Sequence, residues 1–434
     1  MLSREDNELI TRTGPDTPAG KLFRRYWHPV ALARELPPKA APKPVRLLGE
    51  DLVLFRTKLG EPGLMDLHCP HRGTDLSYGR VEDDGLRCLY HGWKFGLDGR
   101  CLDQPGEPKG SNFKNKVRHV AYPCREAGGF ILAYMGEGAP PPLPKLPMFD
   151  APAGHVWSSK MWHECNYLQG VEGEVDSQHL SYLHRMVTPG VAPDEHSKGT
   201  DWLLAADEAP ELECEQTQYG LRLFATRLLG DGRKYVRVTN FIMPYTGAFD
   251  GGPLLDPRTT NMKDNMGYWM HWHVPIDDTH HWKYIVAHCY DSAIDPEYQY
   301  RMIESEMTPA FVSTRDKSNR YLQNRDEMER LTFLGMGYNF QNHDRFATES
   351  QRPISDRTKE HLGASDRNVT TMRRLLLQAI KDSEAGRTPL MSGAESGEAL
   401  ADMVVVSQTV PVAHDNARIW RDFLAERRGA VAAK

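Results

Sequence analysis

The sequence predicts a two-domain α+β protein, in which a small all-β domain precedes a larger domain of mixed strands and helices. Between about residues 45 and 135, short β-prone runs alternate with turns rich in Gly and Asp. A proline-rich segment, residues 139–147, then disfavours both helix and sheet. Beyond it, predicted strands alternate with predicted helices. We therefore place the boundary near residue 140, which gives domains 1–140 and 141–434.

The composition limits the classes of function. The 434 residues are 40% hydrophobic and 26% charged, which is ordinary for a globular chain with a sizeable core. A net charge of −6 argues against nucleic acid or an anionic membrane as the main partner. The sequence contains no apolar run of the ~18 residues that cross a bilayer, and its first residues are polar. Seven cysteines without disulfide spacing fit a reducing compartment, so we expect a cytoplasmic protein.

In the first domain, a short helix is predicted over residues 1–12, where Ser3 and Asp6 form a weak capping box. Two strands are predicted at 45–48 and 52–55, and a buried strand at 130–134. The runs Asp83-Asp84-Gly85 and Asp98-Gly99 are typical of hairpin turns. These elements together describe a small antiparallel domain.

In the second domain, a helix is predicted near 170–186 and strands near 220–229 and 234–243. A hairpin is predicted over 267–290, with its turn at residues 277–279. The spacing of Met372, Leu376 and Ile380 predicts an amphipathic helix over 371–384, and a last helix is predicted over 415–427.

Two short motifs in the first domain carry metal ligands. Cys69 and His71 form a Cys-x-His motif, Cys88 and His91 form a Cys-x2-His motif, and the 16 residues 72–87 separate the two motifs. A Cys2His2 zinc finger takes both cysteines from one turn and both histidines from a helix, whereas here each arm supplies one of each. Two thiolates on one iron and two imidazoles on the other give a Rieske [2Fe–2S] cluster. The spacing therefore favours this cluster over zinc.

A second group of ligands follows the domain boundary. Asp176 and His179 share a face if the segment is helical, whereas His184 would lie about 140° from His179, so the helix must end or distort near 180–184. Two histidines and a carboxylate form the facial triad of non-haem Fe(II) oxygenases. We choose Asp344 as the carboxylate, with Asp356 as the alternative. Asp176 could instead orient His179 from outside the metal shell.

With both groups in one chain, the sequence resembles the oxygenase (alpha) component of the Rieske non-haem iron aromatic-ring-hydroxylating oxygenases. Within that family it most resembles the phthalate dioxygenase type. The resemblance extends over nearly the whole chain and rests on the Asp-x2-His-x4-His spacing and on three segments: YWHPV at 26–30, NYLQG at 166–170 and NFQNHD at 339–344.

The resemblance implies a helix-grip catalytic domain with a curved antiparallel sheet, one [2Fe–2S] cluster, one mononuclear Fe(II), and a homotrimer or stacked hexamer. Electrons would come from a separate flavin and iron–sulfur NAD(P)H reductase, because this chain has no dinucleotide-binding fingerprint. Asp176 matches the family's catalytic bridging aspartate, which links His91 of one subunit to His179 of the next. Glu172, also assigned to the catalytic site, departs from the Asn that many members carry.

The phthalate-type resemblance implies an aromatic carboxylate substrate and O2, with both oxygen atoms added to give a cis-dihydrodiol. Guanidinium groups are the expected partners of a carboxylate. The candidates on predicted pocket-facing strands are Arg237, Arg222 and Arg227, and Lys198 is a further, weaker candidate. A monooxygenase, such as an O-demethylase, is the alternative, because it shares the iron ligands. A Rieske electron-transfer protein is a third reading, against which the second ligand group argues. His271 and His273 share a strand face, where they have packing or surface roles, line the pocket or mark a third metal; packing or surface roles are favoured.

Overall fold

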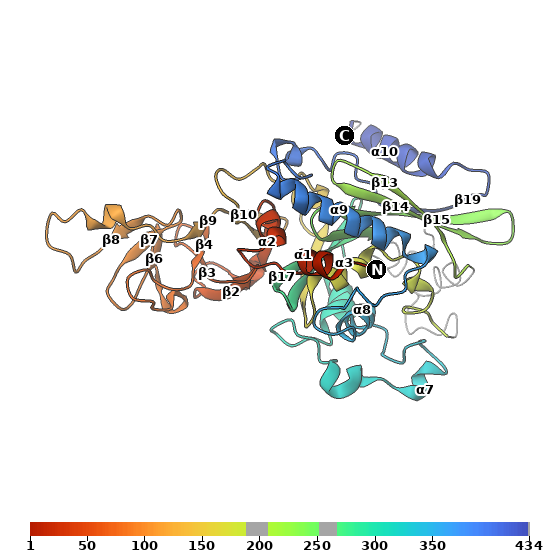
Figure 1. The fold of residues 1–434 in the computed structure, drawn as a ribbon, viewed down its shortest axis with the longest axis horizontal. Helices are drawn as coiled ribbons and strands as arrows, with labels where there is room; N and C mark the ends of the chain where they lie inside the picture. Colours follow the sequence, from red (N-terminus) through yellow and green to blue (C-terminus); the bar gives the residue numbers. More distant parts are fainter. Residues whose placement is uncertain (188–206, 251–266, 433–434) are drawn as a thin grey trace.

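A computed structural model describes residues 1–187, 207–250 and 267–432. It is elongated, with a small β-rich part at one end and a larger mixed part at the other (Figure 1). The small part contains two four-stranded antiparallel sheets, in the orders β2-β3-β4-β9 and β5-β6-β7-β8. The first comprises Lys43–Leu47, Glu50–Arg56, Pro62–Asp66 and Ala121–Tyr122, and the second comprises Arg80–Val81, Gly85–Arg87, Lys94–Gly96 and Cys101–Asp103.

The larger part is built on one eight-stranded antiparallel sheet with the order β12-β18-β17-β16-β15-β14-β13, and β19 also pairs with β15. The strands are β12 Val156–His163, β13 Glu211–Gln216, β14 Gly220–Leu228, β15 Arg233–Ile242, β16 Thr246–Asp250, β17 Gly267–Asp277, β18 His280–Cys289 and β19 Val406–Pro411. The small β domain followed by a mixed domain with an antiparallel sheet confirms the predicted fold class.

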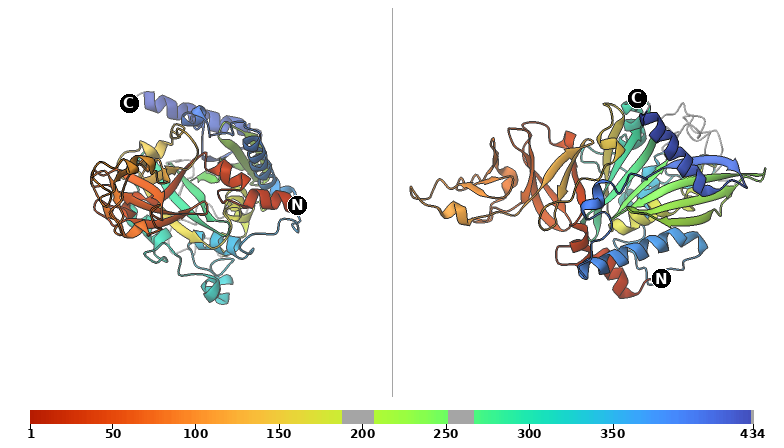
Figure 2. Two further views of the ribbon diagram at one scale, coloured as in Figure 1. Left: turned by 60° about the vertical axis from the view of Figure 1, so that its left-hand side comes forward. Right: turned by 90° about the horizontal axis from the view of Figure 1, so that it is seen from above.

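Helices cover both faces of this sheet. Helix α3 (Tyr167–Val175) packs on β15 to β18, and α8 (Phe340–Glu349) and α9 (Arg367–Glu384) pack against α3. Helix α10 (Asn416–Ala432) packs on β19, where Ile419 joins Val236 and Val238 in an apolar cluster. Figure 2 shows α9 and α10 on opposite sides of the strands. Both faces of β15 are therefore buried. Two short helices, α6 (Pro296–Gln299) and α7 (Arg325–Met328), lie outside this core.

The helix predicted over 170–186 is wrong in its length. Helix α3 ends at Val175, and only a 3-10 turn at His179–Ser181 follows. At the C-cap, Asp176 is extended, with φ −85° and ψ 109°, and its carboxylate accepts hydrogen bonds from the backbone N–H groups of Gln178 and His179. An Asp side chain that binds nearby backbone donors competes with the helix, which explains the early end.

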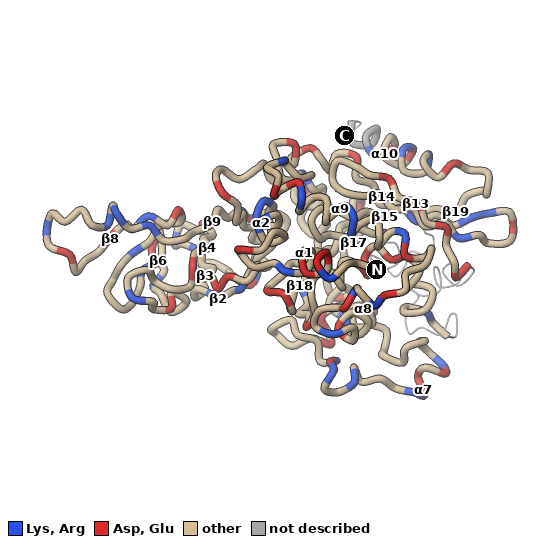
Figure 3. The backbone as a smooth tube through the Cα atoms, viewed as in Figure 1, with Lys and Arg blue, Asp and Glu red and all other residues tan. Residues whose placement is uncertain are grey.

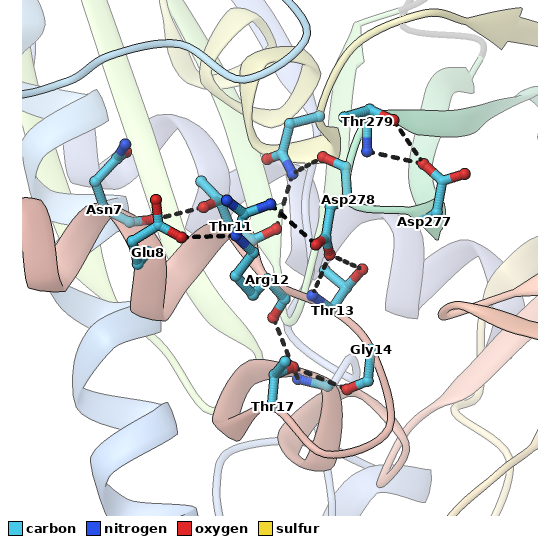
Figure 4. A network of polar contacts seen from close by, with 12 residues as sticks. Asn7, Glu8, Thr11, Arg12, Thr13, Gly14, Thr17, Asp277, Asp278 and Thr279 are labelled. Carbon is cyan, nitrogen blue, oxygen red and sulfur yellow. Dashed lines mark hydrogen bonds and ion pairs between the residues drawn. The ribbon is translucent and has the colours of Figure 1, made fainter.

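The N-terminal helices belong structurally to the larger part, although the small β part follows them in the chain. Helices α1 (Arg4–Thr11) and α2 (Pro18–Phe23) pack on α9. The carboxylate of Asp278, in the β17–β18 turn, accepts hydrogen bonds from the backbone N–H of Thr13 (2.9 Å) and the guanidinium of Arg12 (3.1 Å; Figure 4). The chain then enters and leaves the small part through a sheet of order β1-β11-β10, formed by Trp27–Leu32, Phe130–Tyr134 and Cys124–Ala127.

Residues 140–146 form neither helix nor strand, and the boundary near residue 140 stays a prediction. Acidic and basic residues are interspersed along both parts (Figure 3). Within the residues that the structure describes, no helix has the length and apolarity needed to cross a membrane.

Candidate metal centres

The first candidate centre lies in two loops of the small β part that have the same backbone design. In each loop the N–H of the cysteine, Cys69 or Cys88, donates to the carbonyl five residues further on. The N–H of the glycine four residues after each cysteine donates back to the cysteine carbonyl. Gly73 and Gly92 occupy the left-handed region, with φ of +74° and +77°, where a side chain would be strained. The repeated loop presents two Cys and two His side chains to one place.

The two cysteines and the two histidines differ in how deeply they are buried. Cys69 and Cys88 are each 2% exposed, and burial together with the neighbouring Cys88 raises the pKa of the Cys69 thiol to about 11. The rings of His71 and His91 are partly exposed, with centroids 4.5 Å apart. Trp93 stacks on His71 at 4.3 Å. Two buried thiols beside two outer imidazoles match the donor set of a Rieske cluster, in which one iron takes the thiolates and the other the imidazoles.

The second candidate centre is formed by His179, His184 and Asp344, each of which offers one ligand atom within 4.8 Å of the others. The carboxylate Oδ1 of Asp344 lies 3.1 Å from Nε2 of His184 and 4.0 Å from Nε2 of His179. The histidines follow α3, and Asp344 projects from α8, which the side chain of Asn339 caps. In the described part of the chain, no other three His, Cys, Asp or Glu side chains place their ligand atoms all within 4.8 Å of one another, so this is the one group suited to a single metal ion. Two imidazoles and one carboxylate fit non-haem Fe(II).

A buried histidine that sequence reasoning missed determines which nitrogen of His184 is free. Nε2 of His343 lies 2.9 Å from the carbonyl oxygen of Gly337, and Nδ1 of His343 lies 3.2 Å from Nδ1 of His184. Because burial lowers the pKa of His343 to about 4, its ring is neutral at pH 7. Its Nε2–H therefore donates to Gly337, and its Nδ1 accepts from His184. His184 then carries its proton on Nδ1 and offers the Nε2 lone pair to a metal.

Asp176 lies on the other side of His179 from Asp344. Nε2 of His179 faces Asp344, whereas its buried Nδ1 lies 3.9 Å from Oδ2 of Asp176 and makes no hydrogen bond. Arg227 contacts the same loop, because its fully buried guanidinium donates a hydrogen bond to the carbonyl of Ser177 at 2.7 Å. Arg227 was a weak substrate-binding candidate, but the structure places it on the loop backbone.

A cavity of about 620 Å³ lies beside the three ligands. Its lining carries three cationic side chains in the described part of the chain, and each is paired with a carboxylate. Arg237 donates twice to Asp250 (2.8 and 3.0 Å), and Lys283 lies 3.0 Å from Asp344. Arg373, the third, donates twice to Glu360 and once to Glu172. The described part of the wall therefore offers no unpaired cation.

The structure does not place the other predicted residues at the metal site. Arg222 does not line the cavity: its guanidinium lies 3.6 Å from the ring centroid of Trp420 on the α10 side and pairs with Glu215. Lys198 lies outside the described residues. Asp356 is partly exposed, accepts a hydrogen bond from the hydroxyl of Thr358 and does not join the histidines in a ligand cluster.

Glu172 lines the cavity, but its oxygens are occupied. Arg357 donates to both of them, at 2.7 and 2.8 Å, and Arg373 donates at 2.6 Å. Burial alone would raise the pKa of Glu172, and the two guanidiniums overcome that effect and lower it. Glu172 is therefore a fixed anion that joins α3 to α9 and to the segment carrying Arg357.

Comparison with known proteins identifies the family of the chain. Residues 26–121 match the Rieske [2Fe-2S] domain model, and residues 133–430 match the model described as LigXa C-terminal domain like. The chain belongs to the Rieske non-haem iron oxygenases, as an oxygenase component with a [2Fe–2S] cluster and a mononuclear iron.

Among curated proteins, the chain is 35% identical to the phthalate 4,5-dioxygenase oxygenase subunit of Pseudomonas putida, over 98% of this chain and 95% of that one. It is 34% identical to the 5,5'-dehydrodivanillate O-demethylase oxygenase subunit of a Sphingobium species, over 90% and 83%. The fold is similar to the terminal oxygenase of carbazole 1,9a-dioxygenase from Nocardioides aromaticivorans (TM-score 0.55, 20% identity, 87% of this chain and 97% of that one covered). It is also similar to a structure described as the reduced complex between oxygenase and ferredoxin in carbazole 1,9a-dioxygenase (TM-score 0.56, 20% identity, 89% and 98% covered).

Proposed function

We propose that this protein adds both atoms of O2 to adjacent ring carbons of an aromatic carboxylate, such as a phthalate or a substituted benzoate, to give a cis-dihydrodiol. The observation that carries the proposal is the cavity beside His179, His184 and Asp344 in a chain similar over its full length to a phthalate dioxygenase subunit. Two electrons from NAD(P)H and two protons balance the addition.

In this proposal Cys69, Cys88, His71 and His91 hold the cluster, and His179, His184 and Asp344 hold the mononuclear iron. When bound, the cluster supplies single electrons and the iron supplies oxygen activation. The protein's own contribution is positional. Asp176 lies on the Nδ1 side of His179, whose Nε2 faces Asp344, and the cavity wall orients the aromatic ring of the substrate.

The substrate carboxylate needs a cationic partner, and the described cations are already paired. Arg237 is the strongest candidate in the described wall, because it lines the cavity and would share its guanidinium between Asp250 and the substrate. Lys198 is the alternative. A substrate without a carboxylate would need neither residue. Arg237→Gln and Lys198→Gln should therefore raise KM for the acid more than for its methyl ester.

The experiment is turnover of the reduced enzyme with phthalate, isophthalate, terephthalate and substituted benzoates under ¹⁸O₂. Two labelled atoms in one product support the proposal, whereas one labelled atom shows a monooxygenase.

A second candidate is O-demethylation of an aromatic acid, which the similarity to an O-demethylase oxygenase subunit favours. A methoxybenzoate should then release formaldehyde. A pure electron-transfer role would be shown by two iron atoms per chain instead of three.

The chain requires an electron-transfer partner, and the similar solved oxygenase–ferredoxin complexes support one. We propose that the partner is a flavin and iron–sulfur reductase that uses NAD(P)H. We also propose a cytoplasmic homotrimer or stacked hexamer, in which Asp176 approaches His91 of the partner subunit. Sedimentation of the purified protein tests the assembly.

A further inference from the structure

Lys283 is a buried cation at the back of the mononuclear site, and its function follows from its contacts. It lies on β18 with a side chain only 1% exposed. Its Nζ lies 3.0 Å from Oδ2 of Asp344 and 3.5 Å from Oε1 of Glu174. A buried ammonium group is very unfavourable unless carboxylates pair with it, so its position at these two is strongly determined.

The two oxygens of Asp344 face different partners. Oδ1 points to the two histidines, at 3.1 Å from Nε2 of His184, whereas Oδ2 accepts the hydrogen bond from Lys283. A carboxylate binds a metal through one oxygen or through both, and a charge-assisted hydrogen bond to one of them favours the first mode. One-oxygen binding leaves one more coordination position for other ligands.

Lys283 is itself held in place. Oε1 of Glu174 lies 2.7 Å from Nδ1 of His271 and 3.0 Å from Nε2 of His273, and both rings are buried. His273 is the cross-strand partner of Lys283 on β17. These contacts fix Glu174 beside Lys283, and Glu174 in turn helps to hold the ammonium group close to Oδ2 of Asp344.

We propose that Lys283 is a positioning residue that restricts Asp344 to one-oxygen binding of the iron and so keeps a coordination position free. This inference rests on the proposed iron site. It concerns how many oxygens of Asp344 bind the iron, and it does not depend on which aromatic compound is the substrate.

The test compares Lys283→Met and Lys283→Arg with a matched control, Lys160→Met. Lys160 is also a buried lysine of this sheet, paired with Glu35 at 2.8 Å, but it does not line the cavity. The measurements are iron per chain, the dissociation constant of nitric oxide as a probe of open positions, and X-ray absorption of the mononuclear iron.

Lys283→Met is expected to keep its iron and to bind nitric oxide about tenfold or more weakly, because the second oxygen of Asp344 then takes the position. X-ray absorption should show one additional oxygen ligand. Lys283→Arg retains a charged donor and should lie closer to wild type, and Lys160→Met should match wild type.

Nitric oxide binding equal to wild type in Lys283→Met would overturn the inference, and so would selective loss of its mononuclear iron. If Lys283→Met does not fold, a crystal structure of the iron-loaded wild type decides: two Asp344 oxygens on the iron overturn the proposal and one supports it. A wild type that binds no mononuclear iron would refute the proposed function instead.

Discussion

The contact between His343 and His184 allows a quantitative prediction. In His343→Leu the Nδ1–H of His184 loses its acceptor, and a buried unsatisfied donor is unfavourable by about 1–3 kcal/mol. His184 relieves this by moving its proton to Nε2, where Oδ1 of Asp344 lies 3.1 Å away. That nitrogen is the one offered to iron. We therefore expect Fe(II) binding to weaken about 10- to 100-fold, which is about 1.4–2.8 kcal/mol.

The assay is anaerobic Fe(II) titration of protein that retains its cluster but has been depleted of mononuclear iron, with the cluster absorbance as an internal standard. His343→Gln retains an acceptor and should lose less affinity. His288→Leu is the matched control, because His288 is another buried imidazole and packs on Tyr268 and Tyr290. Fe(II) affinity of His343→Leu within twofold of wild type would refute the tautomer argument.

Three further predictions follow from the other charged and metal-binding groups. Asp176→Asn should keep all of its iron and lose turnover; an active variant would exclude the proposed bridge. Glu172→Gln should lower the free energy of unfolding by about 3 kcal/mol, more than Glu360→Gln, in denaturant titrations at pH 7. The pKa of Glu172 is lowered in the folded state, so near and below the ordinary value of 4.5 the unfolded chain binds more protons than the folded one. The stabilisation by Glu172 is therefore present above pH 4.5 and should fade below it. A difference between variant and wild type that does not change with pH would contradict this. Cys69→Ser should lose the cluster absorbance and keep at most one iron per chain; retained absorbance would exclude Cys69 as a ligand.

The features that could be predicted best from the sequence are those formed by residues close together in the chain. The two cluster loops were predictable because each places its Cys, His and Gly within five residues, and the structure shows the same loop twice. The β17–β18 hairpin was also predictable from the turn residues at 277–279, and α9 from the regular spacing of its apolar residues.

The remaining features depend on contacts that no local pattern reveals. Lys283 and Asp344 are 61 residues apart. Helix α8 was not predicted, because its buried residues include Gln341, Arg345 and Glu349, whose burial depends on partners elsewhere. The orientation of Arg237 was likewise ambiguous, because both faces of β15 are buried, one against the cavity and one against α10.

The attachment of the small β part has a mechanical consequence. Because residues 1–23 are anchored on the larger part, and β1 and β11 are hydrogen-bonded neighbours, the cluster-bearing unit is connected by two adjacent chain segments. The small β part is therefore an insertion held at both ends, and not a domain joined to the rest by a single flexible linker. Proteolytic cleavage at 140–146 alone should leave the two fragments associated, with the orientation of the cluster unit unchanged.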